Sequence, residues 1–103
     1  MSEQDEIVAG RSNHAEVLAQ YGRDPNEALQ QYVNSLGQKL ATQSHRANPQ
    51  WTFTVLDSPE INAFATPGGY VYVTRGLLAY LDDESELAGV LGHEIGQIGR
   101  AHV

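Results

Sequence analysis

The 103-residue chain carries 6 basic and 13 acidic residues, for a formal net charge of −7, and it contains no cysteine. The acidic balance argues against nucleic acid and anionic membrane surfaces as partners, because both require a basic patch. The length suits one small domain, no disulfide or thiolate metal site can form, and no apolar run approaches the ~20 residues of a membrane span.

Two helices are predicted before the first strand. Residues 5–21 place apolar side chains near one side, and Gly22 ends this helix. Asp24 and Glu27 are spaced as a capping box for the second helix, which continues to about Ser44 with leucine and valine at helical spacing. The N-terminal part of the chain is therefore expected to be helical.

A small sheet is predicted next. Residues 51–56 alternate in polarity and are rich in β-branched and aromatic residues, which is typical of a strand. Residues 62–66 and 70–74 flank the Pro-Gly-Gly sequence at 67–69, which favours a hairpin because proline presets φ and glycine supplies positive φ. We expect an antiparallel sheet in which the two tyrosines of the last strand serve in packing and not as a binding platform.

The final third of the sequence predicts two more helices. Thr74 can cap a short helix, and Asp83 and Glu86 are spaced as a capping box for a last helix that starts near Glu84. The acidic run 82–86 is most simply explained by this capping, with calcium binding as the alternative. Together the elements predict an α+β fold: N-terminal helices, a small antiparallel sheet with a hairpin, and a final helix that carries the motif described next.

The last helix contains His93-Glu94-Ile95-Gly96-Gln97, which is the zinc-protease sequence HExxH with glutamine in the last position. In HExxH the two histidines lie about one turn apart, so both imidazoles can bind one Zn²⁺ while the glutamate acts as general base. Glutamine is a poor replacement, because zinc prefers imidazole, thiolate or carboxylate ligands. Gln97 is either an inactivating replacement or a tolerated polar residue on a half-exposed helix face.

Three segments in a fixed order carry a resemblance to a known family: Asn62-Ala63-Phe64-Ala65, residues 67–78 and residues 86–96. The chain resembles the HtpX/BepA-like zinc metallopeptidases, which share the gluzincin catalytic scheme with the CAAX prenyl proteases. The resemblance covers essentially the whole chain. It implies the N-terminal part of a peptidase domain, so residues 1–103 are expected to form a single, incomplete domain.

The resemblance also implies roles for individual residues. His93 is the implied zinc ligand, Glu94 the implied catalytic base, and Gln97 stands at the second-ligand position. The third ligand of the family, a glutamate on a later helix, would lie beyond Val103. The implied substrate-binding residues, on an edge strand that an extended peptide joins, are Asn62, Ala63, Phe64 and Ala65. Zinc is the cofactor of the family, but we expect this chain not to bind it tightly.

The remaining histidines offer no replacement ligand. His102 follows His93 by nine residues, about 900° of helical rotation, so it should face the opposite side of the helix. Nothing in the spacing of His14 or His45 suggests a metal ligand.

Three hypotheses follow from the sequence. The first is a unit of a zinc metalloendopeptidase that acts on peptides or unfolded proteins but is inactive in this form. The second is a non-catalytic module that binds peptides along residues 62–66 or has a structural role. The third is self-association through uncovered apolar surface. The family resemblance suggests the bacterial cell envelope or periplasm as the location.

Overall fold

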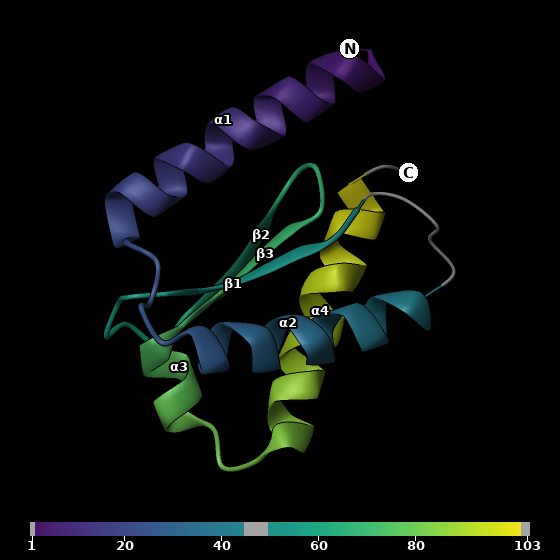
Figure 1. Cartoon of the computed structure of the whole chain (residues 1–103). Coiled ribbons are helices and arrows are strands. Elements are labelled where there is room, and N and C mark those ends of the chain that lie inside the picture. Colours follow the sequence, from purple (N-terminus) through teal and green to yellow (C-terminus); the bar gives the residue numbers. More distant parts are fainter. Residues whose placement is uncertain (1, 45–49, 102–103) are drawn as a thin grey trace.

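The computed structural model describes residues 2–44 and 50–101, the last four by their backbone alone. In this part of the chain the elements are α1 (Glu3–Tyr21), α2 (Glu27–Thr42), β1 (Thr52–Leu56), β2 (Ala63–Thr66), β3 (Tyr70–Thr74), α3 (Arg75–Tyr80) and α4 (Glu84–Ala101) (Figure 1). The predicted α+β class is confirmed. Within the described residues no helix is both long enough and apolar enough to cross a membrane.

The strands form one mixed sheet in the order β1-β3-β2. β2 and β3 form the predicted antiparallel hairpin, and Gly68 and Gly69 in its turn have positive φ values of 98° and 86°. The prediction of an antiparallel sheet is corrected for β1, which runs parallel to β3. The chain reverses direction twice between β1 and β3, once on each side of β2. β3 takes the central position, where Val71, Tyr72 and Val73 are buried from both faces of the sheet.

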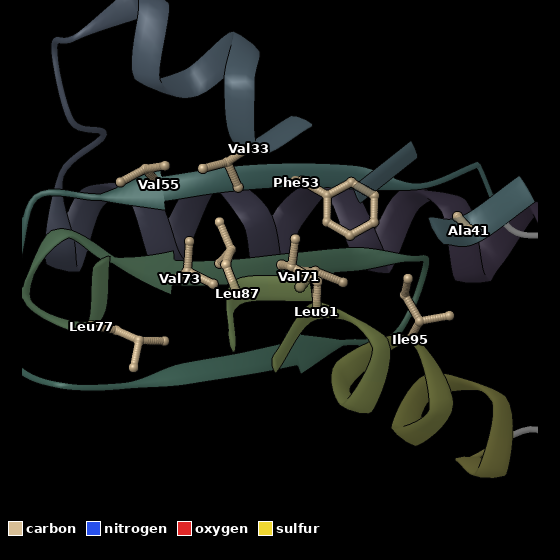
Figure 2. Close-up of a cluster of buried hydrophobic side chains, with 10 residues drawn as sticks. All are labelled: Val33, Ala41, Phe53, Val55, Val71, Val73, Leu77, Leu87, Leu91 and Ile95. Carbon is tan, nitrogen blue, oxygen red and sulfur yellow. The ribbon is translucent and has the colours of Figure 1, made fainter. Parts of the chain in front are cut away.

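Helices α2 and α4 cover one face of the sheet and enclose the core (Figure 1). α2 lies directly against β1, since a Cβ atom added at Gly37 would be 2.5 Å from the ring of Phe53. The buried apolar side chains gather between these helices and the sheet (Figure 2); they are Val33, Ala41, Phe53, Val55, Val71, Val73, Leu77, Leu87, Leu91 and Ile95.

Helix α1 lies on the opposite side of the sheet (Figure 1). It makes its contacts through aromatic rings: His14 stacks on Tyr70 with centroids 4.7 Å apart, and Tyr21 lies 5.9 Å from Phe64. Its one buried residue is Gly10, which faces the hairpin turn. The predicted packing role of the tyrosines on β3 is confirmed, because they lie beneath α1.

The start of α2 differs from the prediction. Its N-cap is Asn26, whose side chain accepts a hydrogen bond from the third amide of the helix at 3.1 Å. The side chain of Asp24 accepts from the amide of Asn26 at 2.9 Å, before the first turn of α2, and its backbone N–H donates to the carbonyl of Val55 at 3.0 Å beside β1. Glu27 pairs with Arg23 and closes no capping box.

The other predicted helix ends agree closely with the structure. Gly22 ends α1 with a φ of 80°, and Thr74 caps α3 by accepting from the amide three residues on at 3.1 Å. At the start of α4 the carboxylate of Asp83 accepts from the amide of Glu86 at 2.9 Å. The Glu86 carboxylate accepts from the amide of Asp82, one residue earlier than a capping box requires. Capping therefore accounts for this acidic run.

Candidate metal and peptide-binding site

Helix α4 presents the His-Glu-x-x-Gln sequence on its outer side. Leu91 and Ile95 point into the core and hold the helix against the sheet (Figure 2). His93 and Gln97 follow these two residues by two positions, about 200° of rotation, and both are exposed. Glu94, about 60° from the apolar stripe, is half-buried. The packing of this apolar stripe thus determines which side chains of the motif face solvent.

The structure brings His93 and Gln97 together. The Nε2 atom of Gln97 lies 3.3 Å from the Nε2 atom of His93. The side-chain amide of Gln97 therefore lies beside the ring nitrogen of His93 on the exposed side of α4.

Glu94 has the electrostatic setting of a perturbed carboxylate. Burial raises its pKa above the usual value, and the nearby ring of His93 opposes this by favouring the charged form. A raised pKa is compatible with acid–base chemistry. Burial beside the apolar stripe is enough to cause it, so the shift alone assigns no catalytic role.

The described residues do not fit a zinc ion. Within the described side chains no group of three or more His, Cys, Asp or Glu residues could hold a metal, whereas a catalytic zinc site has three protein ligands. His14 projects from α1 onto β3, where its Nδ1 atom is 2.7 Å from the hydroxyl of Tyr72. His45 and His102 lie outside the described residues.

The segment predicted to bind substrate forms β2, an edge strand of the sheet next to α4. The carbonyl of Asn62 accepts from the amide of Thr74 at 3.1 Å. Because backbone groups alternate in direction along an antiparallel strand, Phe64 also faces β3, and the N–H and C=O groups of Ala63 and Ala65 point outward. No backbone hydrogen bond in the described part of the chain reaches this outer edge.

The edge formed by β1 is closed at Val55 and Asp57, in contrast to that of β2. The side-chain amide of Gln30 donates to the carbonyl of Val55 at 2.9 Å and accepts from the amide of Val55 at 2.8 Å. The backbone of Asp24 donates to the same carbonyl, and that of Asp57 donates to Gly22 at 2.9 Å. The sequence analysis missed Gln30, because its role depends on a contact 25 residues away.

Thr74 fixes the segment that leads into β2. Its hydroxyl donates to the carbonyl of Glu60 and accepts from the amide of Asn62 at 3.2 Å, in addition to capping α3. The hydroxyl is fully buried. The sequence predicted only the capping role, since the other contacts come from residues 12 and 14 positions away.

The side chains of β2 divide between the two faces of the sheet. Ala63 and Ala65 pack against the core next to α4. Phe64 points to the α1 face, where its ring lies 4.9 Å from that of Tyr72. Asn62, just before the strand, is exposed. Of the four predicted substrate-binding residues, Ala63 and Ala65 thus offer open backbone groups and Phe64 offers a ring on one face.

Residues 27–103 match Peptidase family M48, and the chain belongs to this family. It is 40% identical over 75 residues to the beta-barrel assembly-enhancing protease of Escherichia coli K12. It is 37% identical over 75 residues to the putative beta-barrel assembly-enhancing protease of Vibrio cholerae. It is also 38% identical over 63 residues to the mitochondrial metalloendopeptidase OMA1 of Arabidopsis thaliana.

These alignments cover much of this chain but little of the relatives. The two bacterial matches use 73% of the chain and 15% and 16% of the relatives, and the plant match uses 61% and 13%. The chain therefore spans only a small part of the length of the proteins that it matches. The metallopeptidase family predicted from the three sequence segments is confirmed.

Proposed function

We propose that this chain binds an extended peptide along the outer edge of β2 and, with its residues as they stand, does not hydrolyse it. The observation that carries the proposal is the open edge of β2 beside α4, in a family of peptidases. The proposal also concerns the metal site. In the family zinc would supply Lewis-acid chemistry when bound, but the described residues of this chain do not form a site for it.

The open edge supports peptide binding. Proteins usually protect exposed strand edges with charge, proline or a covering segment, yet residues 61–66 contain no charged residue and no proline. Ile61, just before the strand, is 59% exposed. A peptide that pairs with this edge gains backbone hydrogen bonds from Ala63 and Ala65, while its alternate side chains meet the two faces of the sheet.

The pairing of His93 with Gln97 supports the absence of hydrolysis. The glutamine amide is a neutral and weak ligand in place of an imidazole, and it lies beside the ring of His93 where a second histidine would stand. Glu94 stands at the position of the family's general base. Without a metal ion to activate a water molecule, this base has no nucleophile to generate. The motif residues as they stand are therefore consistent with a chain that binds a peptide near α4 without hydrolysing it.

Zinc titration followed by amide-resolved NMR tests the metal part of the proposal. The chain as it stands should show no saturable shifts at residues 92–97, whereas Gln97→His should bind zinc with shifts confined there. Gln4→His is the matched control, because it adds an exposed histidine on α1 and should gain no binding at α4. Tight binding by the unchanged chain contradicts the proposal. Failure of Gln97→His to bind would show that position 97 is not the switch.

Titration with an extended peptide tests the binding part. We would use an acetylated and amidated peptide of alternating threonine and valine with a lysine at each end. The amides of Ala63 and Ala65 should shift, while that of Val55 on the closed edge should not. Ala65→Pro removes one outward N–H without touching the bonds to β3 and should abolish the shifts, whereas Ala65→Ser should keep them. Unchanged amides at Ala63 and Ala65 at millimolar peptide contradict the proposal.

A second copy of the chain is the alternative occupant of the same edge, and the open backbone groups of β2 favour it equally. Light scattering at high concentration separates the two cases. Reversible dimerisation that Ala65→Pro abolishes supports self-association, and a monomer at all concentrations excludes it.

A further inference from the structure

Helix α1 lies outside the residues that match the peptidase family. The match covers residues 27–103, whereas α1 ends at Tyr21. α1 runs over the face of the sheet opposite α4 (Figure 1). A strand added at the edge of β2 would therefore have α4 on one side of the sheet and α1 on the other.

α1 follows the β2–β3 hairpin through three contacts. Gly10 meets the hairpin turn, where an added Cβ atom would be 3.3 Å from the carbonyl of Pro67. His14 stacks on Tyr70 of β3, and Tyr21 meets Phe64 of β2. The last of these contacts places an aromatic side chain of α1 against the strand whose edge is open.

The end of α1 is fixed in place by backbone hydrogen bonds. The amide of Gly22 donates to the carbonyl of Leu18 at 2.9 Å, and the carbonyl of Gly22 accepts from the amide of Asp57 at 2.9 Å. Tyr21 therefore directly precedes a residue, Gly22, that is hydrogen-bonded both to α1 and to the loop after β1. Tyr21 and Phe64 are both half-buried residues, so neither is fully enclosed by α1 and the sheet.

The geometry of strand pairing defines what these rings would meet. In an antiparallel pair the residue directly opposite Phe64 would have its Cβ atom about 4.5–5.5 Å from that of Phe64, on the same face. That face is the α1 side, because Phe64 stacks on Tyr72 and Tyr72 contacts His14. The next residues of the added strand would point to the α4 side.

We propose that Tyr21 and Phe64 together bind an apolar, preferably aromatic, side chain of a peptide that pairs with β2, and so determine specificity on the face opposite α4. The inference rests on the proposed peptide binding. The two ring centroids lie 5.9 Å apart with an interplanar angle of 46°, and a third ring beside such a pair is favoured in an offset or edge-to-face arrangement. The segment 61–66 carries no charge that would favour a polar side chain there.

Two peptides test this inference: acetyl-Lys-Thr-Phe-Thr-Phe-Thr-Lys-amide and the same peptide with serine at both phenylalanine positions. The phenylalanine peptide should bind about fivefold tighter or more. Tyr21→Ala should lower this ratio about threefold, and Tyr21→Phe should preserve it. Tyr80→Ala is the matched control, since it removes a tyrosine that is 67% exposed on α3 and should leave the ratio unchanged.

A direct readout keeps the test independent of any effect of Tyr21→Ala on the docking of α1. In the unchanged chain, nuclear Overhauser effects should connect a phenylalanine ring of the peptide with the rings of Tyr21 and Phe64. Peptide-induced shifts at Ala63 and Ala65 without these effects, or with an unaltered ratio in Tyr21→Ala, overturn the inference and leave the proposed function standing. An absence of shifts with either peptide overturns the proposed function itself.

Discussion

The Nδ1 atom of His14 lies 2.7 Å from the hydroxyl of Tyr72 and links α1 to the centre of the sheet. Burial raises the pKa of Tyr72 to about 12, so its hydroxyl stays protonated at neutral pH. Burial lowers the pKa of His14 below its usual value of 6.5, which means that the folded state favours the uncharged ring.

The first prediction follows from this shift. A histidine whose pKa is lower in the folded state binds a proton more readily when the chain is unfolded. The stabilisation that the uncharged His14 ring gives the folded state is therefore present above pH 6.5 and is lost as the pH falls through the folded pKa. His14→Phe keeps a ring on Tyr70 but cannot titrate. The free energy of unfolding of the unchanged chain should therefore fall more steeply below pH 6.5 than that of His14→Phe, measured by urea denaturation at several pH values.

The groups that face His14 make this comparison specific. From β3 they are Tyr70 and Tyr72, and the nearby charged residue on its own helix is the exposed Arg11. The other histidines and the carboxylates are the same in both proteins, so their contributions cancel in the difference. Identical pH dependence of the two proteins would show that His14 titrates as freely as an exposed histidine.

The second prediction concerns Thr74. Thr74→Val retains the shape but removes the hydroxyl that bonds Glu60, Asn62 and the start of α3. Loss of these buried bonds should lower the free energy of unfolding by about 1–3 kcal/mol. The amides of residues 60–62 should also exchange faster with solvent. Thr74→Ser, which keeps the hydroxyl, should behave nearly as the unchanged chain, and equal losses in both variants would contradict the role of the hydroxyl.

The elements predicted well from the sequence are those whose causes are local. The hairpin turn depends on Gly68 and Gly69, which adopt positive φ values. The need for positive φ arises within the turn itself and involves no residue distant in sequence. The stripe of α4 and the pairing of His93 with Gln97 depend on helical periodicity. His93 lies outside the core stripe, on the exposed side of α4.

The features that the sequence analysis missed depend on contacts between distant residues. Gln30 satisfies the backbone of Val55, 25 residues later, and His14 meets Tyr72 at a separation of 58 residues. No local pattern identifies such partners, because the side chains are ordinary polar residues on helices. The parallel pairing of β1 with β3 was missed for the same reason, since it follows from the position of β3 between β1 and β2, and that position depends on contacts between distant residues.

The third prediction concerns the stripe that carries the motif. Leu91 is fully buried at the centre of α4, so Leu91→Ala should lower the free energy of unfolding by about 2–5 kcal/mol. Gly92→Ala is the opposite case, because an added Cβ atom there meets no atom within 4 Å and alanine favours helix. It should raise the free energy of unfolding by about 0.5–1 kcal/mol. Urea denaturation measures both, and a destabilising Gly92→Ala would contradict the open space at that position.

The fourth prediction concerns the closed edge of β1. Gln30→Leu keeps the size of the side chain but leaves the amide of Val55 without its partner, while the carbonyl of Val55 still accepts from Asp24. An unpaired buried amide should cost about 1–3 kcal/mol in the free energy of unfolding, and hydrogen exchange at Val55 should accelerate. Gln31→Leu, at the exposed neighbouring position, is the matched control and should change neither quantity. If both variants unfold at the same urea concentration as the unchanged chain, the side chain of Gln30 does not close this edge, and the contrast with the open edge of β2 loses its basis.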